Sequence, residues 1–123
     1  MEDTIYKTIE LENGYTLNIL DVSRQIGADA WLVKMRAVIE IDIDDSLFTR
    51  GLPDGVTLGG ICSELGEKTE YVYEVERNFI MDHEKDALFE SLMQTFLDNL
   101  GQYVAKPVFP EKFVLKAYEE KTK

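Results

Sequence analysis

Strict alternation of apolar and polar residues dominates the first third of the chain, and its longest run extends from Trp31 to Asp44. A period of two is typical of a strand that buries one face and exposes the other. One row of this segment is wholly apolar and comprises Trp31, Val33, Met35, Ala37, Ile39, Ile41 and Ile43. We therefore predict a long strand here, with the apolar row facing the core.

Two shorter alternating segments, residues 4–12 and 15–22, are separated by a glycine-containing turn sequence. A three-residue loop ending at Gly14 pairs the apolar Ile9 with the apolar Leu17, whereas a two-residue loop would set Ile9 against a polar residue. We predict a hairpin with a type I turn and a bulge at Gly14, where a positive φ favours glycine. The inward row of the first strand is predicted to comprise Ile5, Ile9 and Leu11.

Residues 70–80 alternate as well. Antiparallel pairing with the long predicted strand places Lys34 opposite Glu76, and the same register places Arg36 opposite Glu74. Opposite charges directly across a pair of strands stabilise the pairing, so we predict that these two strands are neighbours. The row predicted to face inward comprises Tyr71, Tyr73, Val75, Arg77 and Phe79.

The segment that follows has helical spacing. Asp82 is suited to cap a helix, and residues 83–103 carry apolar side chains three and four positions apart. These positions are Leu88, Phe89, Leu92, Met93, Phe96, Leu97 and Leu100. We predict one long amphipathic helix.

The remaining segments are less regular. Residues 45–68 are rich in glycine and predict an irregular loop, with a short turn or strand at Ile61–Leu65. Lys112–Tyr118 alternates and predicts a short final strand, and the charged tail at 119–123 is expected to fray. The whole pattern predicts a single α+β domain over residues 1–123. We expect a mainly antiparallel sheet of four or five strands with the long helix packed on one face.

The charge balance narrows the range of partners. The chain has 123 residues, with 13 Lys and Arg against 24 Asp and Glu, and its net charge is −11. Binding to nucleic acid or to an anionic membrane draws on cationic side chains, so we expect neither. Cys62 is the sole cysteine, no secretory signal is visible and no apolar run is long enough to span a bilayer. We expect a cytoplasmic protein.

Few residues are suited to chemistry. His83 lies in an exposed first helical turn, and Cys62 has the apolar sequence neighbours of a buried, inert thiol. One histidine and one cysteine exclude the usual zinc ligand sets. Asp42, Asp44 and Asp45 lack the glycine and the distal glutamate of a calcium loop, so solvent exposure is favoured over a weak divalent site. We predict no catalytic residues, no metal and no cofactor, and hence no enzyme.

Two arginines are the candidate ligand-binding residues. Arg77 falls on the row predicted to face inward, where a buried guanidinium needs a partner. Asp21 or Glu10 would supply a structural ion pair, or the side chain would extend along the surface with its guanidinium exposed. The functional alternative is an anion-binding site formed by Arg77 together with Arg24.

One motif is a near-match to a nucleotide-binding family. The residues Asp21, Ser23 and Gly27 resemble the D/N-x-S-x-x-G motif of PilZ domains, which bind cyclic di-guanylate on a β-barrel. Here the glycine comes one residue late, and no arginine precedes Arg24 to supply the upstream arginine pair. We do not adopt that function.

Several runs together resemble an uncharacterised family of small bacterial cytosolic proteins. They are Asp21-Val22-Ser23-Arg24, Trp31-Leu32-Val33, Glu76-Arg77-Asn78-Phe79-Ile80 and the segment 109–116. The resemblance implies a bacterial, single-domain protein and implies no activity. We therefore expect a non-enzymatic protein-interaction or scaffold domain whose partner is itself or another protein. The alternative is a module that binds a small ligand or an anion through Arg24 and Arg77.

Overall fold

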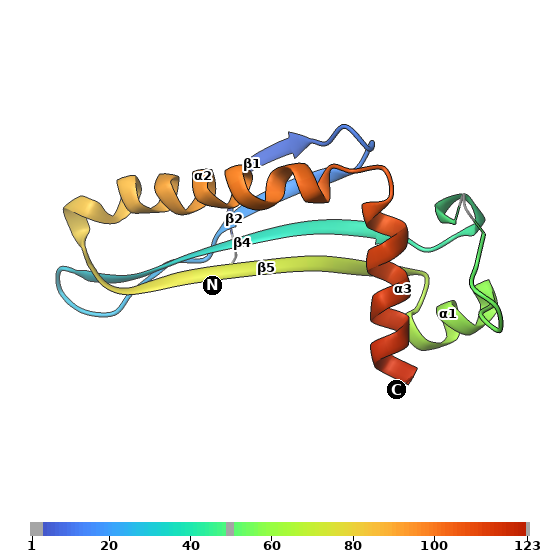
Figure 1. Ribbon diagram of the computed structural model, residues 1–123. Coiled ribbons are helices and arrows are strands. Elements are labelled where there is room, and N and C mark those ends of the chain that lie inside the picture. Colours follow the sequence, from blue (N-terminus) through green and yellow to red (C-terminus); the bar gives the residue numbers. More distant parts are fainter. Residues whose placement is uncertain (1–3, 49–50, 123) are drawn as a thin grey trace.

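The computed structural model describes residues 4–48 and 51–122, which form one antiparallel five-stranded sheet and three α-helices (Figure 1). This confirms the predicted α+β class. The strands are β1 (Thr4–Glu10), β2 (Thr16–Asp21), β3 (Arg24–Gln25), β4 (Ala30–Asp42) and β5 (Lys68–Met81). The helices are α1 (Leu58–Leu65), α2 (Lys85–Val104) and α3 (Phe109–Thr122), with short 3-10 turns at Asp45–Leu47 and Asp82–Glu84.

Strand β4 is the centre of the sheet. It pairs with β2 and β3 along one edge and with β5 along the other, while β1 pairs with β2. Between β2 and β3 the ladder is interrupted, and the backbone N–H of Lys34 donates to the Ser23 hydroxyl at 2.9 Å. The side chain of Ser23 thus satisfies a donor that the interruption would otherwise leave unpaired.

The registers predicted from the sequence are confirmed. Ile9 lies opposite Leu17, and Gly14 has a φ of 88°. Between β4 and β5, charged residues face each other as predicted, with Arg36 opposite Glu74 and Lys34 opposite Glu76. The apolar rows therefore sufficed to set the register of the hairpin, and the opposite charges sufficed to set that of β4 with β5.

The inward row of β1 was predicted wrongly at one position. The register shifts between Ile5 and Lys7, so Ile5 lies opposite Leu20 and leaves the apolar row. Tyr6 takes its place, and its ring contacts that of Phe89 at a centroid distance of 4.6 Å. A bulge inserts one extra residue, which moves every residue beyond it to the opposite face.

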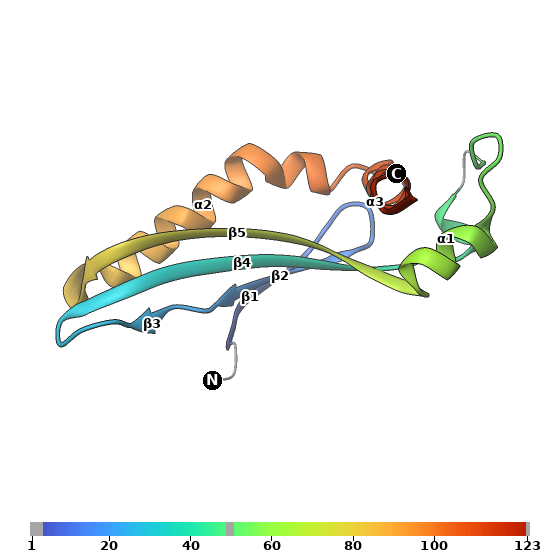
Figure 2. The same ribbon diagram turned by 90° about the horizontal axis from the view of Figure 1, so that it is seen from below.

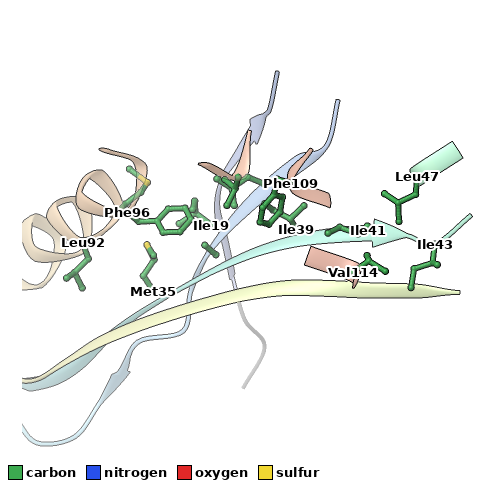
Figure 3. Close-up of a cluster of buried hydrophobic side chains, with 14 of the residues drawn as sticks. Ile19, Met35, Ile39, Ile41, Ile43, Leu47, Leu92, Phe96, Phe109 and Val114 are labelled. Carbon is green, nitrogen blue, oxygen red and sulfur yellow. The ribbon is translucent and has the colours of Figure 1, made fainter. Parts of the chain in front are cut away.

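The core lies on the face of the sheet that carries the odd-numbered residues of β2 and β4, here called the core face. Four buried residues of α2 pack against it, and Figures 2 and 3 show α2 running along this side of the sheet. The rings of Tyr73 and Phe96 lie 5.0 Å apart. These α2 residues are Phe89, Leu92, Met93 and Phe96, and a fifth buried residue at the end of the helix, Val104, belongs to the same core cluster. The opposite face is here called the open face, because the apolar side chains of β2, β4 and β5 that point there are outside the core cluster.

Three expectations about local structure were wrong. The Asp82 carboxylate accepts from the Trp31 indole N–H at 2.9 Å, and no described side chain caps α2. The region 45–68 contains the helix α1, whose cap is Thr57. The predicted strand 112–118 belongs to α3, which continues to Thr122, while Lys123 of the tail lies outside the described residues. Phe109, Phe113, Val114 and Tyr118 follow one another at spacings of four, one and four residues, which places them on one helix face, and Pro110 is tolerated in the first turn.

The hairpin turn is joined to the end of α2 by one side chain. The Asn13 amide donates to the carbonyls of Val104 and Lys106, at 2.9 and 3.0 Å, and its oxygen accepts from the Tyr15 N–H at 3.1 Å. Asn13→Ala is expected to lower the free energy of unfolding by about 1–3 kcal/mol, because Val104 is buried and its carbonyl loses a donor. Urea denaturation measures the change. Asn13→Asp keeps the acceptor alone and is expected to lose nearly as much, so a neutral result for either variant contradicts this role.

Candidate functional site

Strand β5 has 14 residues and pairs with β4 along one edge, and no other described strand pairs with its second edge. The Ile43 N–H donates to the Glu67 carbonyl at 2.8 Å. An odd-numbered residue next to β4 thus bonds toward the β5 side. The even-numbered Lys34 bonds toward the other side, where its carbonyl accepts from the Val22 N–H at 3.1 Å. Backbone groups alternate along an antiparallel ladder, so the odd-numbered residues of β5 as far as Arg77 bond to β4. The even-numbered residues direct their N–H and C=O groups away from the sheet.

Three of these even-numbered residues are acidic, and their side chains lie on the open face. The Glu74 carboxylate accepts from Arg36 at 2.6 Å and lies 3.7 Å from the Lys34 ammonium. The hydrogen bond from Arg36 lowers the pKa of Glu74. Glu70 and Glu76 form no ion pair with any residue in the described ranges. The free edge therefore carries uncompensated negative charge.

At the corner where β5 begins, Glu40 lies directly opposite Glu70. Lys68 partly neutralises this corner, with its ammonium 2.8 Å from Glu40 and 3.8 Å from Asp42. The hydrogen bond to Glu40 raises the pKa of Lys68.

The open face is hollowed beside this edge. A shallow depression of about 550 Å³ crosses β1, β2, β4 and β5. Its floor combines apolar side chains with the charged ends of others: Ile5, Asn18, Leu20, Arg36, Val38, Glu70, Val72 and Glu74. Val72 remains 48% exposed there although it belongs to a regular strand. The depression, which offers both apolar and charged contacts, thus lies beside the edge of β5 that no other described strand pairs with.

Phe79 was predicted to face the core and instead is 79% exposed. The register between β4 and β5 shifts between Trp31 and Val33, so Ile80 packs against the core in its place. Phe79 has a φ of 56°, the single positive φ of a described non-glycine residue. Left-handed backbone costs an aromatic residue about 1–2 kcal/mol, and strain of this kind concentrates at functional sites. Three consecutive apolar residues at 79–81 break the alternation and were the signal for this shift.

Phe79→Asn is expected to stabilise the domain by about 1 kcal/mol, because asparagine tolerates left-handed backbone. The exposed ring of Phe79 makes no large contribution to the core, so little packing is lost. The melting temperature should rise by several degrees in a calorimetric scan. Phe79→Leu keeps the strain and is the matched control, with no gain expected. A lower melting temperature for Phe79→Asn would show that the exposed ring contributes to folding.

The structure does not bring Arg24 and Arg77 together. Arg24 lies opposite Leu32 and Arg77 opposite Val33, and consecutive residues of β4 point to opposite faces. Both arginines are exposed, so Arg77 lies on the predicted row but forms no buried ion pair, in agreement with the alternative of an exposed guanidinium. The Arg77 guanidinium donates to the Glu76 carbonyl at 2.8 Å and pairs with neither of its predicted acidic partners.

The residues considered for catalysis and metal binding also lie apart. Cys62 belongs to α1, whereas His83 precedes α2 at the opposite end of the sheet (Figure 1). The Cys62 thiol lies 3.9 Å from the Ile43 carbonyl. Asp44 caps the first 3-10 turn by accepting from the Ser46 N–H at 3.0 Å. Within residues 4–48 and 51–122, no group of three or more His, Cys, Asp or Glu residues is arranged to hold a metal ion.

Comparison of the chain with protein-family models, with curated proteins and with solved structures found no match. The resemblance to a bacterial family therefore stays a prediction. No helix in the described ranges is both long enough and apolar enough to cross a membrane. The candidate site accordingly rests on the geometry of β5 and the open face.

Proposed function

We propose that this chain is a non-enzymatic, cytoplasmic protein-interaction domain that binds an extended segment of another polypeptide as an added strand along β5. The observation that carries the proposal is the row of backbone N–H and C=O groups at Glu70, Val72, Glu74 and Glu76. These groups point away from β4 and have no described strand beside them, and one of them, the Glu76 carbonyl, already accepts from the Arg77 guanidinium. Strand addition uses such groups for affinity and the flanking side chains for specificity.

Two further features support strand addition. Edge strands are protected by shortness, proline, charged side chains or bulges. Strand β5 is long and contains no proline, its bulge lies beyond Arg77, and the charges along its regular part are mainly acidic, so they select a basic partner. The depression around Val72 offers apolar contacts to alternate side chains of a segment lying along the edge. The alternative of an anion-binding module is less well supported, because Arg24 and Arg77 lie on opposite faces.

The proposal is tested with a random ten-residue peptide library displayed against the folded chain. Val72→Pro removes an N–H that points away from β4, so the β4–β5 ladder keeps its hydrogen bonds while the free edge loses a donor. We expect peptides enriched on the wild type to lose binding to Val72→Pro and to keep it with Val72→Thr. Circular dichroism checks that both variants stay folded.

Hydrogen exchange locates the bound peptide. In the complex the amides of Val72 and Glu74 should gain protection, because they become donors to the added strand. The amides of Tyr73 and Val75 already bond to β4 and should change little. A library that yields no binders, or binders indifferent to Val72→Pro, overturns the proposal.

A further inference from the structure

We infer that the segment bound along β5 is basic and apolar, with Lys or Arg at alternate positions opposite Glu70, Glu74 and Glu76 and an apolar residue opposite Val72. This inference rests on the proposed function and names the chemistry of the partner.

The residues that offer free backbone groups are also the residues whose side chains lie on the open face. In an antiparallel pair, hydrogen-bonded residues sit directly opposite each other with their side chains on the same face. A strand added at Glu70, Val72, Glu74 and Glu76 therefore places alternate side chains over this row. Three of those four positions present a carboxylate, and two of them, Glu70 and Glu76, form no ion pair with a described residue, so cations opposite the row stabilise the pairing and further acids oppose it.

The charge on this row argues against a second copy of the chain as the occupant. Antiparallel self-pairing centred on Val72 sets Glu70 against Glu74, and pairing centred on Tyr73 sets Glu70 against Glu76. Centring on Val75 sets Glu74 against Glu76. Each of these three registers places like charges directly opposite, between two chains that each carry a net charge of −11. Centring on Tyr71 sets Lys68 against Glu74, but Lys68 is already held by Glu40 and Asp42.

The length of the segment follows from the bulge. Beyond Arg77 the register of β5 against β4 shifts, so the regular row of free backbone groups ends at Glu76. At its other end, β5 begins at Lys68, whose ammonium is held by Glu40 and Asp42. The segment therefore spans about seven residues, opposite positions 70–76.

The inference is tested with two synthetic peptides labelled for fluorescence anisotropy. The basic peptide contains Lys-Thr-Lys-Thr-Val-Thr-Lys, and the acidic peptide replaces each Lys with Glu. We expect the basic peptide to bind at least tenfold more tightly than the acidic one, with the advantage shrinking as NaCl is raised. The double variant Glu70→Lys, Glu76→Lys should reverse the preference, and Val72→Pro should remove binding of the basic peptide.

The outcomes separate this inference from the proposed function. Equal affinity for both peptides that is abolished by Val72→Pro keeps strand addition and overturns the basic partner. Binding of the basic peptide that is unaffected by Val72→Pro overturns strand addition itself. Absence of binding by the basic peptide overturns the inference, and the library decides the proposed function. Sedimentation tests whether a second copy of the chain occupies the edge instead. A wild-type dimer that becomes monomeric in Val72→Pro would identify that second copy and contradict the inference.

Discussion

Ile39→Lys is expected to unfold the domain, whereas Val38→Lys on the adjacent position of β4 leaves it folded. Ile39 is 0% exposed and lies between Leu17 and Tyr71 on the core face. A buried ammonium without a partner costs several kcal/mol, comparable with the total stability of about 5–15 kcal/mol of a domain. Val38 lines the open depression near Glu70, so its replacement is expected to cost about 1 kcal/mol or less.

Circular dichroism and urea denaturation of the two variants measure the difference. The comparison tests which face of the sheet is buried, because the two positions share a strand and differ in the face to which they point. If Val38→Lys also unfolded the chain, the open face would be a second buried surface. The binding surface proposed for that face would then be excluded.

Phe109→Ala is expected to lower the free energy of unfolding by about 3–5 kcal/mol. Phe109 is 2% exposed, and its ring centroid lies 5.3 Å from that of Tyr71, 5.8 Å from that of Phe113 and 5.2 Å from that of Tyr103. Truncation leaves a cavity where α3 meets the beginning of β5, since this ring joins the helix to the strand. Urea denaturation gives the magnitude.

Tyr103→Ala is the matched control, because Tyr103 contacts the same ring but is 49% exposed. Its loss is expected to stay below about 1.5 kcal/mol. Native-state hydrogen exchange should show α3 opening first in Phe109→Ala, with the middle of β4 still protected. Equal losses for the two variants would show that burial of Phe109 is not what fastens α3 to the sheet.

The strands and their registers could be read from the chain because their signals are local. Alternation in β4 and the glycine of the hairpin act over a few residues, and a one-residue slip would move a whole apolar row into water. The pairing of Arg36 with Glu74 followed from that register. The row of alternate side chains along β5 as far as Arg77 could be predicted for the same reason, because it depends on regular β geometry.

The last segment of the chain shows where that reading fails. Lys112–Tyr118 fits alternation as well as helical spacing, and short apolar runs do not distinguish the two. The helix forms because Phe109 and Phe113 meet Tyr71, a residue distant in the sequence. Phe79 was placed wrongly for a related reason, since the register of β5 against β4 shifts beyond Arg77 and a local pattern does not show such a shift.

The order of residues was thus enough to establish the fold class, four of the strands, the hairpin turn and the charged pairs across β4 and β5. The folded arrangement settled which edge stays unpaired, which face stays open and where a bulge turns an aromatic ring outward. Periodicity reports how a segment divides its side chains between two sides. Whether a neighbour covers either side depends on contacts between segments far apart in the chain, and a local pattern does not encode them.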